Sequence, residues 1–300
     1  MAAPRLCEGR ICIVTGGARG IGRQHSLMLA EHGAKVVVND FGGARDGTGG
    51  DPGPANEVVE EITAAGGEAV ANSADVSDFA AAGALVQQAI DTFGGLDVVV
   101  SNAGILRDRM LFSMTEEEWD AVIRVHLKGT FGPARHAAAY WRERAKAGEA
   151  NDARLITTTS VSGLYGNMGQ TNYGAAKAGI AAMTLIAADE LARYGVTANS
   201  IAPGALTRMT EDLGIPDDAR AGMDPRWIAP IVTWLASTES QHVTGRVIES
   251  TGSVMAIAEG WRRGPSTKTP PAEPTDVKDV LATLLQDARG RSNMQGAERK

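Results

Sequence analysis

Short apolar runs alternate with longer stretches of helical period along most of the chain. The first run, ICIVTG at residues 11–16, is strand-like, and a helical pattern follows it from about residue 23 to 32. The other expected strands are AKVVVND (34–40), EAVANSADV (68–76), LDVVVSNAG (96–104), RLITTTS (154–160) and VTANSIAPG (196–204). The other expected helices cover about 57–65, about 79–93, a long stretch from about residue 115, and the segment around Tyr173. This order predicts successive β-α-β units.

Several of the runs contain consecutive valines, so they present apolar side chains to both faces of a sheet. Such strands are typical of a parallel sheet that is covered by helices on each side. The sequence therefore predicts an α/β protein with a Rossmann-type, doubly wound parallel sheet. The chain has 300 residues, 43% of them hydrophobic, and we expect a single domain over residues 1–262.

Two segments break the alternation. Residues 41–54, FGGARDGTGGDPGP, are rich in glycine and proline and are expected to form a long surface loop. Residues 263–300 are expected to form a C-terminal extension, in which an extended linker, PSTKTPPAEP, precedes an amphipathic helix. The apolar stripe of this helix comprises Val277, Val280, Leu281, Leu284 and Leu285. We expect the stripe to dock on its own domain or on a neighbouring subunit rather than on a membrane, because basic residues do not dominate its polar face.

The charge balance excludes some classes of partner. A net charge of −7 and a pI near 5.3 disfavour nucleic acid and anionic membrane surfaces. The two cysteines, Cys7 and Cys12, are expected to be reduced packing residues, and we predict neither a disulfide framework nor a metal site. The sequence contains no apolar stretch of spanning length and no secretory h-region, so the expected location is the cytoplasm.

A glycine-rich turn follows the first expected strand. Its spacing is G-x-x-x-G-x-G, and the residues that we expect to contact a ligand there are Gly16, Arg19, Gly20, Ile21 and Gly22. Glycines at such a strand-to-helix turn let a pyrophosphate approach the backbone at the positive end of the helix. The turn therefore predicts a dinucleotide site.

Asp40 bears on which dinucleotide is bound. It ends the second strand, 18 residues after Gly22, where an acidic residue accepts hydrogen bonds from the adenosine ribose and repels a 2′-phosphate. Arg19 opposes this, because a guanidinium in the glycine turn could pair with the extra phosphate of NADP. We weigh Asp40 more heavily and predict NAD, although Asp40 could also be an ordinary cap at a strand end.

The next two strands also end in residues that would face the ligand. In an open parallel sheet, side chains at the carboxyl ends of the strands line the crevice. The residues at these positions, which we expect to contact the adenine side, are Asp75 and Val76 after the third strand and Asn102, Ala103 and Gly104 after the fourth.

One run, SVSGLYGNMGQTNYGAAK, holds the candidate catalytic residues Ser160, Tyr173 and Lys177. Tyr173 and Lys177 are four residues apart on an expected helix and share a face. A phenol ionises near pH 10, so Tyr173 needs a stabilised phenolate to act as a base, and the Lys177 ammonium is placed to provide it. Ser160 would hold the reacting oxygen. The alternative is a chance Y-x-x-x-K on a solvated helix.

Together these motifs resemble the classical short-chain dehydrogenase/reductase family over about residues 6–258. The motifs are the glycine turn, Asn102-Ala103-Gly104, Ser160, Tyr173-x-x-x-Lys177, and Pro203-Gly204 followed by Thr207. The resemblance implies that Tyr173 and Lys177 contact the nicotinamide ribose side, and that Pro203, Gly204 and Thr207 contact the nicotinamide.

Longer phrases, such as VVVNDFGG and SNAGILRDRM, resemble the (3R)-hydroxyacyl-CoA dehydrogenase part of peroxisomal multifunctional enzyme type 2 and related actinobacterial proteins. His126 stands where most family members have an asparagine that holds a proton-relay water, which implies a catalytic role. The alternative is a buried helix histidine with satisfied nitrogens.

The resemblance implies an enzyme that interconverts a secondary alcohol and a ketone with NAD, and its small-molecule substrate would be a fatty or steroid side-chain 3-hydroxyacyl-CoA. Free hydroxysteroids and a 3-oxoacyl reductase role remain open, as does a catalytically silent dinucleotide sensor. The family usually forms homodimers or homotetramers through the helix of Tyr173, whose small and apolar residues suit close packing.

Overall fold

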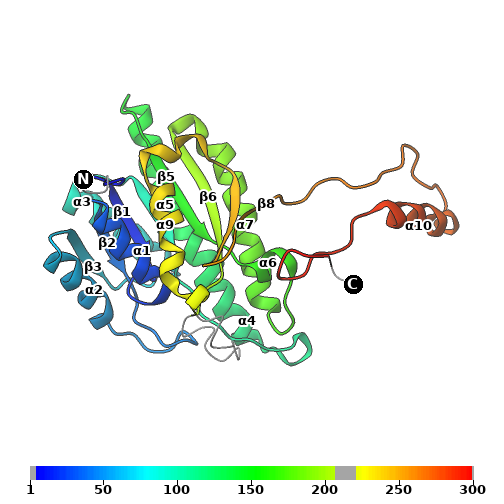
Figure 1. Cartoon of the computed structure of the whole chain (residues 1–300), viewed down its shortest axis with the longest axis horizontal. Helices are drawn as coiled ribbons and strands as arrows, with labels where there is room; N and C mark the ends of the chain where they lie inside the picture. The colour runs from blue at the N-terminus through cyan, green and yellow to red at the C-terminus, as the bar shows by residue number, and fades with distance from the viewer. Residues whose placement is uncertain (1–4, 207–220, 299–300) are drawn as a thin grey trace.

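The fold is built on one eight-stranded sheet (Figure 1), in the order β3-β2-β1-β4-β5-β6-β7-β8. A computed structural model describes residues 5–206 and 221–298. All neighbouring strands are parallel except β7 and β8, which pair antiparallel. The strands are β1 (Ile11–Thr15), β2 (Lys35–Asn39), β3 (Glu68–Asn72), β4 (Val98–Ser101), β5 (Ala153–Thr158), β6 (Val196–Pro203), β7 (Arg246–Ser250) and β8 (Met255–Ala258). The predicted doubly wound α/β fold is confirmed.

Helices cover both faces of the sheet. Those in the described residues that matter for the argument are α1 (Gly20–Glu31), α2 (Gly53–Ala64), α3 (Phe79–Phe93), α4 (Glu116–Ile123), α5 (Gly129–Lys146), α6 (Val161–Tyr165), α7 (Thr171–Leu191), α9 (Ala229–Ala236) and α10 (Val277–Asp287). Val36 and Val38 of β2 pack in one core with α1, α2 and α9, whereas Val37 packs in a second core with α3, α5 and α7. Consecutive valines thus serve opposite faces, as the pattern predicted.

The element boundaries differ from the prediction where local chemistry intervenes. α2 begins at Gly53, inside the stretch expected to be loop, because Pro54 is favoured in the first turn of a helix. The helix expected near residue 115 starts with a capping box between Thr115 and Glu118. It is then interrupted by a π-helical segment, Arg124–Lys128, before α5 begins. The two short strands β7 and β8 were not predicted.

The C-terminal extension does not pack its helix on the sheet. Figure 1 shows α10 projecting away from the rest of the chain at the end of an extended segment. Val277, Leu281 and Leu285 of its stripe are 43%, 48% and 65% exposed. The stripe was expected to dock on the chain's own domain or on a neighbouring subunit. In the described structure it does not dock on its own domain. Among the described residues, no helix is long and apolar enough to cross a membrane.

Candidate active site

The glycine turn lies between β1 and α1 and is shaped by two close approaches. Gly16 has φ +61°, and a Cβ on Gly22 would lie 1.9 Å from the carbonyl oxygen of Gly16. The helix starts after Arg19, whose side chain forms no capping hydrogen bond, and the first turn contains no acidic residue. The first amides of α1 are therefore left to bind an anion, as a pyrophosphate site requires.

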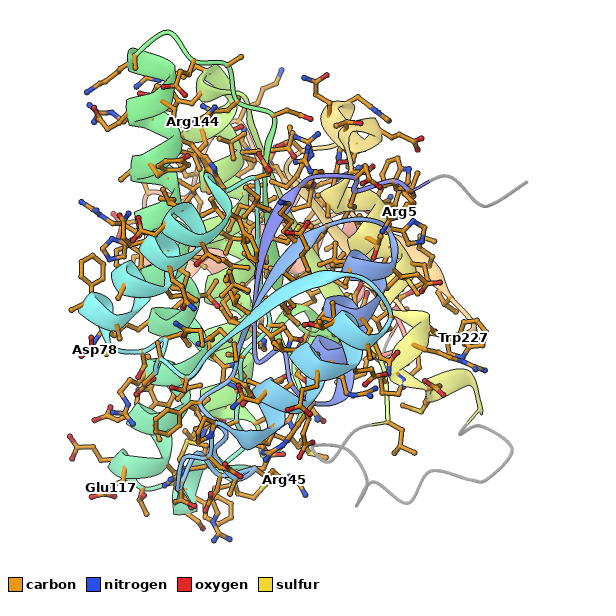
Figure 2. All side chains as sticks on the ribbon, turned by 90° about the vertical axis from the view of Figure 1, so that its left-hand side faces the viewer. Arg5, Arg45, Asp78, Glu117, Arg144 and Trp227 are labelled. Atoms are coloured by element: carbon orange, nitrogen blue, oxygen red, sulfur yellow. The ribbon has the colours of Figure 1, made fainter. Side chains whose placement is uncertain are left out.

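A cavity of about 790 Å³ opens beside this turn. Its size falls within the usual range of small-molecule sites. All but one of the cofactor residues predicted at the first four strand ends line this cavity. They are Gly16, Arg19, Gly20, Ile21, Asp40, Asp75, Val76, Asn102, Ala103 and Gly104. The exception is Gly22, which packs behind the turn. Figure 2 shows Arg45, another lining residue, at the same end of the molecule as Glu117 and far from Arg144.

Asp40 ties the glycine turn to the loop after β2. Its carboxylate accepts hydrogen bonds from the amides of Ala18 (3.1 Å) and Gly42 (2.8 Å). Arg19 Nη1 donates to the carbonyl oxygen of Gly43 at 3.1 Å, so it also contacts this loop. Asp40 thus caps local backbone amides and also lines the cavity, so its predicted roles as a cap and as a cofactor contact are compatible.

Asn102 and Asp75 are partly committed to holding the backbone. Asn102 Nδ2 lies 3.2 Å from the carbonyl oxygens of both Thr15 and Gly16 and donates to them, so its amide fixes the glycine turn. Asp75 Oδ1 accepts from the amide and the hydroxyl of Ser77 at 2.9 and 2.7 Å. Both residues line the cavity, but the sequence did not reveal these supporting roles.

Ser160, Tyr173, Lys177 and His126 come together at the carboxyl end of β5. Ser160 caps α6, and its side chain lies near enough to the phenol of Tyr173 to lower the pKa of that group. Lys177 Nζ lies 5.6 Å from the centroid of the Tyr173 ring. The His126 ring meets the Tyr173 ring edge-on, with 5.1 Å between the centroids. The spacing in the sequence therefore does correspond to one cluster in space rather than to a solvated helix face.

Burial dominates the protonation of this cluster. It raises the pKa of Tyr173 to about 12, although the Ser160 side chain acts in the opposite direction. It also lowers the pKa of Lys177 to about 7. Removal from water disfavours both the phenolate and the ammonium, and the expected stabilisation of the phenolate by Lys177 stays a prediction. Lys177 Nζ donates to the carbonyl oxygen of Thr158 at 2.6 Å.

His126 sits in the π-helical segment and is 1% exposed. Its Nε2 lies 2.7 Å from the Ile105 carbonyl oxygen, whereas its Nδ1 is buried and has no hydrogen-bond partner among the described residues. Burial, with the positive charge of Lys177, lowers the pKa of His126 to about 3, so the ring is neutral. A Cβ on Gly104 would lie 2.3 Å from His126 Cε1, which explains why this position needs glycine. One ring nitrogen is satisfied and the other is not.

The nicotinamide side is described only in part. Pro203 ends β6, and the amide of Gly204 donates to the carbonyl oxygen of Ser250 at 2.9 Å. Thr207 lies outside the described residues. Asn172 was missed by the sequence analysis, and its side chain donates to the backbone oxygens of Arg107 (2.9 Å) and Glu118 (3.2 Å). It thereby fastens the loop after β4 to the helix of Tyr173.

Comparisons with known proteins agree with this geometry. A family model described as short chain dehydrogenase matches residues 10–216. Hydroxyacyl-CoA dehydrogenase ChsB1 of Mycobacterium tuberculosis is 50% identical over 251 residues, which are 80% of this chain and 76% of that protein. Peroxisomal multifunctional enzyme type 2 of Mus musculus is 42% identical over 261 residues, 87% of this chain and 33% of that protein. A crystal structure of a short chain dehydrogenase from Mycobacterium avium has a TM-score of 0.87 at 53% identity and covers 95% of this chain and 98% of that one.

Proposed function

Because the chain belongs to the short-chain dehydrogenase family, we propose that it uses NAD to oxidise a 3-hydroxyacyl-CoA thioester to the 3-oxoacyl-CoA. Membership of the family makes it an oxidoreductase that acts on hydroxyl groups, and the resemblance stated from the motifs is confirmed. The proposal depends on one observation. Ser160, Tyr173 and Lys177 form a cluster at the carboxyl ends of the strands, where the glycine turn also lies.

The residues around the cavity fit a nicotinamide dinucleotide. The uncapped start of α1 and the close approach at Gly16 and Gly22 suit the pyrophosphate, and Asp40 suits the ribose of NAD. Asp75, Val76 and Asn102-Ala103-Gly104 would contact the adenosine half. Lys177, Pro203, Gly204 and Thr207 would contact the nicotinamide half. When bound, NAD supplies the hydride acceptor and a positively charged ring.

The chain's own residues would manage the proton. Tyr173 accepts the proton of the substrate hydroxyl while Ser160 bonds to the same oxygen and holds it in place. With NAD bound, the phenol of Tyr173 would experience the positive charge of the nicotinamide ring in addition to that of Lys177, which would lower the pKa of Tyr173 from the value that burial sets. In the reverse reaction, the protonated Tyr173 returns the proton to the oxygen.

His126 would carry the proton onward. Nε2 lies 2.7 Å from the Ile105 carbonyl oxygen and 3.1 Å from the Ile105 amide nitrogen, whereas Nδ1 is buried and has no partner among the described residues. Nδ1 is therefore the ring nitrogen that is available to exchange a proton. We therefore include it in the catalytic set. His126→Asn should keep part of the turnover and His126→Leu should lose more, with the loss in kcat rather than in KM. Equal activity of both variants and the unchanged enzyme would remove His126 from the set.

The substrate proposal is tested with a panel. NADH formation is measured with (3R)- and (3S)-hydroxyacyl-CoA esters of several chain lengths, including steroid side-chain esters, and with free hydroxysteroids, and the series is repeated with NADP. We expect the highest kcat/KM for an acyl-CoA with NAD. Preference for a free hydroxysteroid, or for 3-oxoacyl reduction with NADPH, selects one of the alternatives. NAD binding without turnover of any substrate indicates the silent sensor.

Self-association is part of the proposal. The outer face of α7 is apolar, with Leu185 41% and Ile186 57% exposed, beside the small residues Ala178 and Ala182. We propose a cytoplasmic homodimer or homotetramer in which this face meets its copy, while residues 1–262 form the catalytic domain and 263–300 an extension. Ile186→Arg should reduce the mass in analytical ultracentrifugation, and an unchanged mass contradicts this interface.

A further inference from the structure

The loop after β2, residues 41–51, forms part of the wall of the dinucleotide cavity. Its first end is held by the Gly42 amide, which donates to the Asp40 carboxylate at 2.8 Å. Further along, the loop closes on itself, because the Ala44 amide donates to the carbonyl oxygen of Thr48 at 2.7 Å. Several of its residues line the cavity, namely Phe41, Gly43, Ala44, Arg45, Gly47 and Gly49. A dinucleotide in the cavity would therefore meet a loop that already has internal structure.

The middle of this loop contacts the segment that follows β4. The carbonyl oxygen of Arg45 accepts a hydrogen bond of 3.1 Å from the Leu106 amide. The carbonyl oxygen of Asp46 accepts one of 2.9 Å from Arg107 Nε. The second of these contacts uses a side chain, so a substitution at Arg107 removes it without altering the sequence of the loop.

Ile105, in the same segment, contacts both the loop and His126. A Cβ on Gly47 would lie 3.0 Å from Ile105 Cδ1, so the backbone of the loop packs directly on this side chain. The backbone oxygen and nitrogen of Ile105 lie 2.7 and 3.1 Å from His126 Nε2. The position of the histidine ring thus depends on a residue against which the loop packs.

Arg107 contacts both the loop and the helix of Tyr173. While its Nε donates to Asp46, its carbonyl oxygen accepts a hydrogen bond of 2.9 Å from Asn172 Nδ2. Asn172 is buried, and its Oδ1 accepts from the Tyr173 amide at 2.7 Å. Arg107 therefore lies between the loop and the first turn of the helix that carries the proposed proton acceptor.

We propose that Arg107 is a positioning residue, which ties the loop to the segment that holds His126 and Tyr173, so that a dinucleotide bound against the loop also fixes these two side chains. This inference rests on the proposed function. Among the described residues, Arg45 and Ile105 line the cavity and Arg107 does not, so Arg107 acts through its neighbours. A shift of about 1 Å in a reacting group can lower a rate by about a hundredfold, so a contact outside the cavity can still govern turnover.

Substitution of Arg107 tests the link from the side of the segment. Arg107→Met should lower kcat with NAD and a 3-hydroxyacyl-CoA roughly tenfold and change the KM for the acyl-CoA little. Arg107→Lys keeps a donor and should recover part of the kcat. The matched control is Arg109→Met, because Arg109 pairs with Glu118 at the surface rather than with the loop, and its kcat should stay the same. An unchanged kcat in Arg107→Met overturns the proposal.

Substitution of Gly47 tests the same link from the side of the loop. Gly47 and Gly49 have φ +88° and +75°, so alanine strains the backbone at either position, but only on Gly47 would its Cβ meet Ile105. We expect a lower kcat in Gly47→Ala than in Gly49→Ala. Gly47→Ala combined with Arg107→Met should lose less than the product of the two single losses, because both changes break one link. Losses that multiply indicate independent local damage and contradict the proposal.

Hydrogen exchange separates this inference from the proposed substrate. Exchange of backbone amides is measured by mass spectrometry with and without the dinucleotide that binds, NAD or NADP. In the unchanged chain the dinucleotide should slow exchange in residues 41–51, 104–109 and 170–175, whereas in Arg107→Met it should do so mainly in 41–51. The same protection in both chains, or protection confined to 41–51 in the unchanged chain, overturns the inference. The expected pattern in a chain that oxidises no 3-hydroxyacyl-CoA supports the inference and overturns only the proposed function.

Discussion

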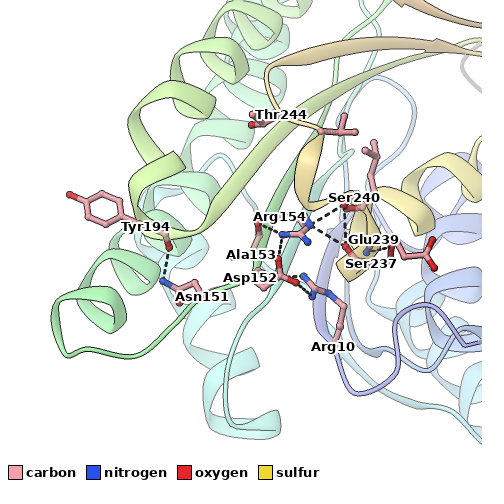
Figure 3. Close-up of polar contacts among 12 residues, drawn as sticks. Arg10, Asn151, Asp152, Ala153, Arg154, Tyr194, Ser237, Glu239, Ser240 and Thr244 are labelled. Atoms are coloured by element: carbon pink, nitrogen blue, oxygen red, sulfur yellow. Dashed lines mark hydrogen bonds and ion pairs between the residues drawn. The ribbon is translucent and has the colours of Figure 1, made fainter.

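The two ends of the central sheet differ in whether a buried cationic side chain has a carboxylate beside it. At the amino end (Figure 3), Arg154 is 1% exposed and its Nη1 lies 2.5 Å from Asp152 Oδ1. Arg10 reaches the other oxygen of Asp152 at 3.1 Å, and Arg154 Nε donates to the Ser237 carbonyl oxygen and to Ser240. At the carboxyl end, Lys177 is 3% exposed, and among the described residues no carboxylate forms an ion pair with it.

This difference separates a structural site from a reactive one. A buried cation with a carboxylate beside it keeps its charge and holds elements together, here β5 and the segment after α9. Burial lowers the pKa of both cations, but among the described residues Lys177 has no carboxylate to oppose the shift, so its pKa falls to about 7 and its protonation responds to whatever binds nearby. Burying the Lys177 ammonium without a carboxylate therefore costs stability at the carboxyl end of the sheet. We infer that the proton transfer there depends on this unpaired charge.

The largest effect is expected at the carboxyl end. Tyr173→Phe removes the group proposed to accept the proton of the substrate hydroxyl and should lower kcat by about a thousandfold or more. NAD binding, measured by calorimetry, and the midpoint of urea unfolding should change little. Tyr194 lies at the amino end of the sheet, just before β6, so Tyr194→Phe is the matched control and should keep full activity. Substantial residual turnover in Tyr173→Phe contradicts the assignment.

Asp152→Asn tests the amino end. It removes the carboxylate that is paired with two buried arginines, so the free energy of unfolding should fall by about 3 kcal/mol. The kcat of the folded fraction should stay the same, because the substitution is far from the cluster. Urea titration and initial rates are measured on one preparation. A loss of kcat with unchanged stability would reverse the roles of the two ends.

Asp40→Ala should weaken NAD binding by tenfold or more, about 1.4 kcal/mol, because a charged hydrogen bond to the ribose is lost. It should also narrow the preference for NAD over NADP, since the repulsion of a 2′-phosphate disappears. Both are read from calorimetric titrations with the two dinucleotides. Arg19→Ala is the companion variant. If the Arg19 guanidinium contacts the 2′-phosphate, Arg19→Ala should weaken the binding of NADP more than the binding of NAD, whereas Asp40→Ala should not.

The sequence predicted those features that depend on the identity of a side chain. The glycines at 16 and 22 are required by close backbone approaches, and the Tyr173 and Lys177 spacing follows from helix geometry. The carbonyl oxygen of Thr158 that accepts from Lys177 had no signal, because any residue type offers a backbone oxygen. Strands β7 (RVIES) and β8 (MAIA) lack the three consecutive valines that marked β2 and β4. The pKa of Lys177 depends on burial, which no local pattern reveals.

The last prediction is a pH dependence of stability that comes from Lys177 and is spread over several pH units. Its pKa falls from 10.5 to about 7 on folding, so between pH 7 and 10 the unfolded chain binds more protons than the folded one. Stability of the protein without dinucleotide should therefore rise with pH in this window, by up to about 1.4 kcal/mol per pH unit. Urea unfolding at several pH values measures the slope, and Lys177→Met should reduce it. Arg154 stays charged throughout and should add no slope, so an unchanged slope in Lys177→Met would mean that the carboxyl end is as well compensated as the amino end.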